Sequence, residues 1–170
     1  MGLGIAVTFV MVTTVPLNYL LNEYVLSPGA LAWINPEFGT DGAHPVDLSF
    51  LSFIVFIAVI ASFVQLVEMV VEKFTPTLYN QLGIFLPLIA VNCAILGGSL
   101  FMQEREYATL GEASAFALGS GVGWWLAIVL MAAIREKMAY SNVPAPLQGA
   151  GITFILTGLM GIAFMTFLGI

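Results

Sequence analysis

The chain alternates long apolar runs with short polar segments that carry nearly all of its charged residues. Five of the apolar runs are long enough to cross the apolar core of a bilayer, roughly 30 Å thick, as helices that rise about 1.5 Å per residue. The pattern therefore predicts an all-α polytopic membrane protein, with a single integral membrane domain over residues 1–170 and no soluble module. The five predicted spans are residues 3–26, 48–71, 82–102, 113–134 and 147–168.

The connecting segments predict an orientation. Lys73 lies in the second connection, and Arg135 and Lys137 lie in the fourth. The first connection has no Lys or Arg, and the third has only Arg105, flanked by two glutamates. Because basic residues favour the cytoplasmic side, we expect connections two and four in the cytoplasm and the C-terminus on the opposite side.

The longest connection, residues 27–47, is rich in Pro and Gly, which is typical of a loop. Within it, residues 30–34 are predicted to form a short turn anchored at the membrane interface by Trp33. His44, the only histidine, lies in the same loop, far from the middle of any predicted span.

Two of the predicted spans contain proline, which removes a backbone hydrogen bond. Pro16 lies in the first span and Pro87 in the third, where the glycine pair Gly97 and Gly98 follows ten residues later. This spacing favours a broken or half-length helix in the third span, with residues 92–93 close to the break. A kinked continuous helix is the alternative interpretation.

Cys93, the only cysteine, lies near the middle of that third span. One interpretation is an inert thiol that packs among apolar residues. The other is a metal ligand in a site completed by other chains. Iron–sulfur iron takes four thiolate ligands, or occasionally histidine, and His44 is too distant to contribute. Any cluster bound by Cys93 would therefore be shared between subunits.

Ionisable groups within a span are candidates for function. Glu68 lies about one turn inside the end of the second span, on one helical face with Gln65 and Glu72. It is a candidate for a cation path, with ordinary solvated charge as the alternative. The first span offers a second such group near its end, comprising Asn18, Asn22 and Glu23.

The fourth span carries small residues every four positions, which is typical of close helix packing in membranes. No strand precedes its glycines, so a nucleotide-binding loop is excluded. The chain shows no catalytic triad and no complete enzyme site of its own. The small residues of this face are Ala115, Gly119, Gly123 and Ala127.

Five stretches of the sequence together resemble those of a known family of membrane proteins. Over essentially all of its length the chain resembles the E-type membrane subunits of the bacterial Na⁺-translocating NADH:quinone oxidoreductase, the Nqr complex. The paralogous subunit of the Rnf complex shares the core of the third span and is the nearest alternative. The matching stretches are residues 2–7, 46–51, 82–98, 119–124 and 134–138.

The resemblance implies a redox role. Family members have six membrane spans, including half-helices, and the E-type and D-type subunits are related to each other and pack as an inverted pair. Cysteines of both types hold an iron–sulfur cluster, expected to be of 2Fe–2S type, inside the bacterial inner membrane. Cys93 aligns with one of these ligands. Asn92 is then a candidate for a group that hydrogen-bonds near the cluster sulfurs, with helix–helix hydrogen bonding as its alternative.

The same resemblance places the rest of the chemistry elsewhere. This chain would be one subunit of an NADH:ubiquinone reductase that transports Na⁺, beside the A-, B-, C-, D- and F-type subunits. Those other subunits would bind the flavins, NADH and quinone. The C-terminus would then face the periplasm.

One departure from the family stands out. The family's first cysteine lies in a span that precedes the stretch matched by residues 2–7, so we expect Met1 to be an internal methionine of a longer chain. A small transporter or scaffold with a passive cysteine is the competing function. The genomic DNA upstream of Met1 would distinguish a redox subunit of this family from a transporter or scaffold. Only the redox subunit requires an in-frame apolar segment with a cysteine there.

Overall fold

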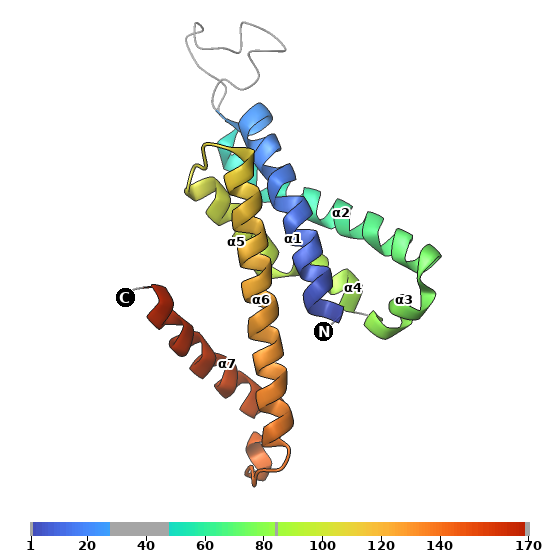
Figure 1. Cartoon of the computed structure of the whole chain (residues 1–170), viewed down its shortest axis with the longest axis vertical. Helices are drawn as coiled ribbons and strands as arrows, with labels where there is room; N and C mark the ends of the chain where they lie inside the picture. The colour runs from blue at the N-terminus through green and yellow to red at the C-terminus, as the bar shows by residue number, and fades with distance from the viewer. Residues whose placement is uncertain (1, 28–47, 84, 169–170) are drawn as a thin grey trace, which may run out of the picture. The chain divides into compact units, whose positions relative to one another are not determined.

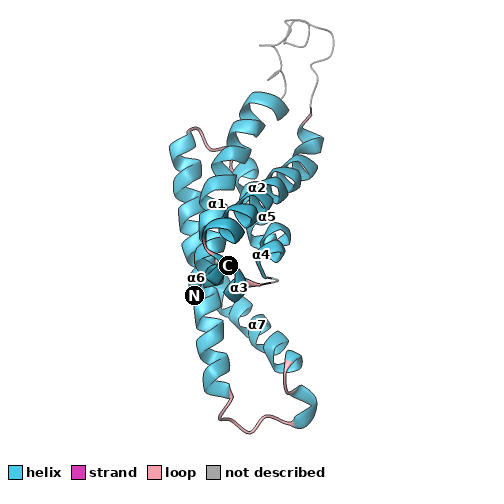
Figure 2. Ribbon diagram, turned by 90° about the vertical axis from the view of Figure 1, so that its right-hand side faces the viewer, coloured by secondary structure: helices cyan, strands magenta, loops and turns pink. Residues whose placement is uncertain are grey.

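The computed structural model describes residues 2–27, 48–83 and 85–168. All regular elements in these ranges are helices (Figure 2). The predicted turn at Trp33 and the position of His44 lie outside the described residues.

Four helical segments are long and apolar enough to cross a membrane, at residues 2–26, 49–74, 85–104 and 110–138. The prediction of an all-α polytopic membrane protein is therefore confirmed. The fifth predicted span is shorter than expected. Its helix α7 (Ala150–Met165) has 16 residues, because it begins only after Gly149, a residue with a φ of +85°, and ends in the 3-10 turn η7 (Thr166–Leu168).

The chain forms two compact units, residues 1–125 and 126–170. The first unit begins with α1 (Gly2–Leu21) and the π-helical turn η1 (Asn22–Leu26). It continues with the following elements: η4 (Ser49–Leu51), α2 (Ser52–Phe74), α3 (Pro76–Leu82), α4 (Phe85–Leu88), η5 (Ile89–Val91) and α5 (Cys93–Glu104). Helix α6 (Leu110–Met138) begins in this unit.

The second unit contains the end of α6, the 3-10 turn η6 (Ala145–Leu147), α7 and η7. None of the residues of α7 is buried. Many of its apolar side chains, including Phe154 and Ile162, are exposed. A surface of this kind is stable only against lipid or another protein.

The core of the first unit lies where α1 packs against α2 and α5 (Figure 1). Residues spaced three or four apart face this core, as the 3.6-residue period of a helix requires. On α2 they are Phe56, Ile60 and Val64, each at most 2% exposed. The buried apolar residues of α1 are Val7, Val10, Met11 and Val15. Helix α1 is continuous through Pro16.

A polar pair is buried in this core. The side-chain amide of Asn18 on α1 donates a hydrogen bond of 2.8 Å to the Ser99 hydroxyl on α5, and both residues are 0% exposed. The Ser99 hydroxyl in turn donates to the carbonyl of Ile95 at 3.3 Å. The Asn18 carbonyl oxygen has no partner within the described residues. The pair fixes which residues of α1 and α5 face each other.

Ser99→Ala is expected to lower the free energy of unfolding by about 1–3 kcal/mol, because it leaves the buried Asn18 amide without an acceptor. Ser62→Ala is the matched control, since the Ser62 hydroxyl is exposed and donates only to Ala58 of its own helix. Thermal denaturation of the purified protein measures both. Equal stability of the two variants would contradict the structural role of the pair.

Candidate metal-ligand site at Cys93

The third span is interrupted, as the broken-helix prediction required. After α4 and η5 the chain is extended at Asn92, with φ −73° and ψ 114°, and α5 begins at Cys93. Pro87 lies within α4. Gly97 and Gly98 do not mark the break, because α5 runs through both of them. Gly98 instead provides close packing, since a Cβ there would lie 3.3 Å from the Met11 side chain.

Asn92 explains where α5 begins. Its side-chain oxygen accepts a hydrogen bond of 3.0 Å from the backbone N–H of Ala94. This is an N-cap, which satisfies one of the amides left unpaired at a helix start. The interaction is local and does not connect two helices. The proposed role of Asn92 beside a cluster stays a prediction.

Cys93 is the first residue of α5, and its side chain is exposed on the surface of the chain. It lies near the middle of the apolar segment 85–104. The thiol therefore lies on the surface of the described part of the chain and is not packed in the core of the first unit. Around it lies a shallow hollow of about 340 Å³, lined by Leu3, Phe85, Leu88, Ile89, Val91, Asn92, Cys93 and Trp124.

The hollow does not by itself form a metal site among the described residues. The described residues contain no group of three or more His, Cys, Asp or Glu side chains that would hold a metal ion. If Cys93 binds a metal, the further ligands would have to come from outside the described part of the chain. The apolar lining would exclude water once the hollow is covered.

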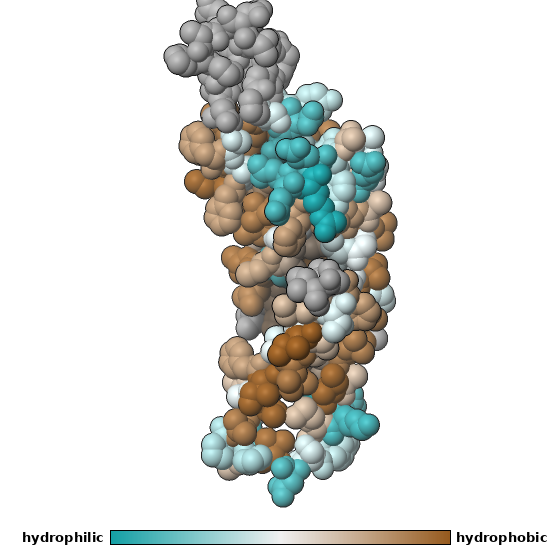
Figure 3. All heavy atoms as spheres, turned by 90° about the vertical axis from the view of Figure 1, so that its left-hand side faces the viewer, coloured by the Kyte–Doolittle hydropathy of each residue, from teal (hydrophilic) through white to brown (hydrophobic). Residues whose placement is uncertain are grey.

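The two groups of polar residues that the sequence offered as functional candidates, one on the second span and one at the end of the first, lie in different surroundings. Glu68 on α2 is half-buried, whereas Gln65 and Glu72 are exposed. At the end of α1, Asn22 and Glu23 line a separate polar pocket of about 370 Å³, whose other walls include Gln103 and Glu106. Hydrophilic side chains gather on this face of the first unit, where α5 connects to α6 (Figure 3).

The small-residue face of α6 that contacts the core differs from the predicted one. Ala113, Ala117 and Gly121 are buried. A Cβ on Gly121 would lie 2.9 Å from Thr8 of α1, whose hydroxyl donates a 3.0 Å hydrogen bond to the Gly121 carbonyl. The predicted residues Gly119 and Gly123 are exposed and have open space around them. Ala115 is exposed as well and Ala127 is half-buried, so most of the predicted face is uncovered within the described residues.

The sequence matches the family described as "Rnf-Nqr subunit, membrane protein" over residues 1–170. The chain belongs to the Rnf-Nqr family. Among similar proteins, this Rnf-Nqr chain is 59% identical over 170 residues to the E-type subunit of the Na⁺-translocating NADH-quinone reductase of Psychromonas ingrahamii, a match that covers 100% of this chain and 80% of that protein. The protein of the same name from Psychrobacter cryohalolentis is 55% identical over 168 residues, covering 99% and 79%.

Two features of this Rnf-Nqr protein were not predicted from the sequence. The Asn18–Ser99 pair joins residues 81 positions apart, and no local pattern marks it. The capping role of Asn92 had a usable signal, because asparagine is among the preferred residues directly before a helix.

Proposed function

We propose that this protein is a membrane subunit of a Na⁺-translocating NADH–quinone reductase. The observation that carries the proposal is the 55–59% identity, over nearly the whole chain, to proteins named as the E-type subunit of that enzyme. Those names favour the Nqr complex over the paralogous Rnf complex. The membrane-length helices and the interrupted third span agree with such a role.

An affinity tag on this chain is expected to recover the other subunits of the reductase from solubilised membranes, together with Na⁺-stimulated NADH–quinone reductase activity. Membranes from a strain that lacks the gene serve as the control and should lose that activity. A tagged chain that is recovered alone, from membranes that retain full activity after the gene is deleted, would contradict the proposal.

The finer proposal concerns electron transfer. Cys93 supplies one thiolate to an iron–sulfur cluster, expected to be 2Fe–2S, that is shared with the D-type subunit within the inner membrane. Its exposure at mid-span supports this role, because a partner's ligands must reach the same iron. When bound, the cluster supplies one-electron transfer between flavins held by other subunits. NADH and quinone also bind elsewhere.

The chain's own residues would position and tune that site. The N-cap of Asn92 fixes the first turn of α5, so the Cys93 side chain leaves the helix from a defined position. The N-terminal end of a helix carries partial positive charge, which favours negative charge beside it. The apolar side chains of Leu88 and Val91 would keep water from the sulfur, and burial of this kind is one of the factors that set a cluster's potential.

For the transported cation, Glu68 is the candidate within a span. Glu68→Gln is expected to raise the Na⁺ concentration needed for half-maximal turnover severalfold, because a half-buried carboxylate in a membrane helix attracts a cation more strongly than an amide does. Glu72→Gln is the matched control, since Glu72 lies one turn further along α2 and is exposed. Turnover of the purified complex against Na⁺ concentration measures both. An unchanged Na⁺ dependence in Glu68→Gln would rule out the cation path.

The orientation also stays a proposal. The basic residues favour a cytoplasmic position for the connection between α6 and α7 and a periplasmic C-terminus. The polar pocket lined by Asn22 and Glu23 would then open toward the periplasm.

A further inference from the structure

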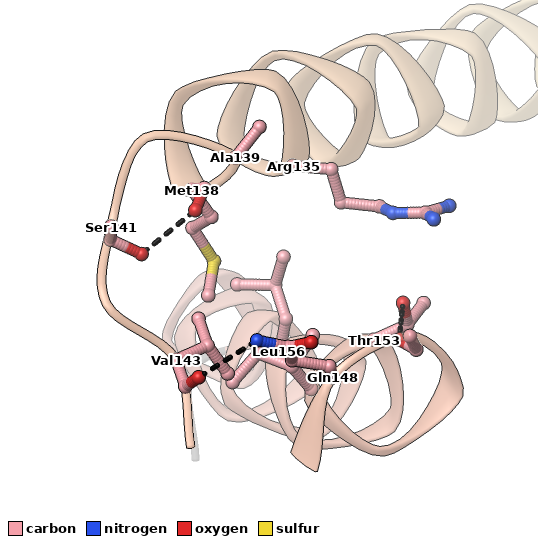
Figure 4. A pocket seen from close by; sticks show the side chains of 10 residues that line it. Arg135, Met138, Ala139, Ser141, Val143, Gln148, Thr153 and Leu156 are labelled. Atoms are coloured by element: carbon pink, nitrogen blue, oxygen red, sulfur yellow. Dashed lines mark hydrogen bonds between the residues drawn. The ribbon is translucent and has the colours of Figure 1, made fainter. Parts of the chain in front are cut away.

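A second hollow lies within residues 126–170, at the point where two apolar helices are joined. It has a volume of about 350 Å³ and lies between the end of α6 and the start of α7 (Figure 4). Helix α6 is long and apolar enough to cross a membrane, so we expect its end to lie at the level of the lipid headgroups. The hollow is therefore at the membrane interface.

One side of this hollow is positively charged. Arg135 is the only charged residue among those that line it. Its guanidinium extends along the opening toward the side of Thr153 (Figure 4). Within residues 2–27, 48–83 and 85–168 the structure gives the guanidinium no ion pair and no hydrogen bond, so its charge is available to a ligand.

The other polar side chains of the wall each donate a hydrogen bond to a backbone carbonyl. The Ser141 hydroxyl donates to the Met138 carbonyl at 2.8 Å, and the Gln148 amide donates to the Val143 carbonyl at 3.1 Å. The Thr153 hydroxyl donates to the Gly149 carbonyl at 3.0 Å. These bonds shape the wall but leave Arg135 as the group that selects a ligand.

The rest of the lining is apolar. Met138, Ile152 and Leu156 are half-buried and line the same space. Ile152 and Leu156 are four residues apart on α7 and so lie on one face of a helix that continues into the membrane. A ligand that fits has an anionic head for Arg135 and an apolar tail that follows α7.

We propose that this hollow, at Arg135, Ile152 and Leu156, binds an anionic phospholipid. The phosphate lies beside the Arg135 guanidinium, which matches phosphate in charge and in hydrogen-bond geometry. An acyl chain covers Ile152 and Leu156. Basic pockets between membrane helices bind lipid headgroups in the same way. The inference is independent of the electron-transfer role proposed for Cys93.

The test uses the protein purified from membranes with its accompanying subunits, in nanodiscs of phosphatidylethanolamine with a small share of phosphatidylglycerol. Native mass spectrometry counts the phosphatidylglycerol that stays bound. Arg135→Gln is expected to lower this retention about fivefold, the effect of one basic side chain near a lipid surface. Leu156→Trp, which fills the apolar part of the hollow, is expected to lower it as well.

Lys137→Gln is the matched control, because it makes the same change of charge two residues along α6 and Lys137 does not line the hollow. It should retain phosphatidylglycerol like the unaltered protein. Equal losses in Arg135→Gln and Lys137→Gln would overturn the proposal, as would no loss in Arg135→Gln. Displacement of the lipid by millimolar inorganic phosphate would also overturn it, because the site would then bind the free anion.

Discussion

Cys93→Ala in the assembled complex is expected to remove the iron–sulfur centre and to lower quinone reduction at least about a hundredfold. Changes that only touch the neighbours of metal ligands already cost tenfold to a hundredfold, and this change removes a ligand itself. The hollow around Cys93 offers no replacement, because its other lining residues are apolar apart from Asn92. Iron content and the electron paramagnetic resonance signal of the reduced complex measure the centre directly.

Two further variants test whether the effect comes from loss of the thiol or from a change in the side chains around it. Cys93→Ser keeps nearly the size of the side chain and should also lose most of the quinone reduction, because a serine oxygen is a much poorer ligand to iron than a thiolate. Val91→Ala trims an apolar residue of the same hollow and should keep the iron, because it removes no ligand. Normal iron content and turnover in Cys93→Ala would refute the ligand role while leaving the family assignment intact.

Gly4→Ala is expected to be the most destabilising single-methyl change in the first unit. Gly4 is buried on α1, and a Cβ there would overlap the ring of Trp125 on α6. Overpacking of this kind costs about 1–3 kcal/mol. The gain in helix propensity from glycine to alanine, up to about 1 kcal/mol, opposes it only in part. Thermal denaturation followed by loss of the monodisperse peak in size-exclusion chromatography measures the difference.

Gly119→Ala supplies the comparison for this prediction. Gly119 also lies on a membrane helix, but it is exposed and a Cβ there would meet nothing within 4 Å. Its melting temperature should stay equal or rise slightly. If Gly119→Ala were as damaging as Gly4→Ala, the tight contact between α1 and α6 would not be the reason for the effect.

The interrupted third span shows how much of the fold can be predicted from the sequence. Pro87 and the glycine pair ten residues after it predicted an interrupted helix with residues 92–93 close to the break, and the helix is interrupted there. The part expected of the glycines was wrong. Gly97 and Gly98 were expected to belong to the break, yet α5 runs through both of them, and Gly98 packs closely on Met11. The capping hydrogen bond of Asn92 sets the boundary instead.

Helix α6 shows why contacts between distant segments resist prediction. The periodicity of small residues identified helix packing correctly, but the span carries two such faces. Ala113, Ala117 and Gly121 form one, and the predicted residues form the other. The choice between them depends on Thr8, more than a hundred positions earlier, which reaches the Gly121 carbonyl. No local property of α6 distinguishes the two faces.

The hydrogen bond between Asn18 and Ser99 has a consequence for biosynthesis. Its two partners are 81 residues apart, so the ribosome must add that many residues after Asn18 before the bond can form. At about 5–20 residues per second this takes roughly 4–16 s. During that interval α1 has a polar amide in its apolar stretch and no α5 to receive it. The insertion machinery, or water within it, must accommodate Asn18 until α5 arrives.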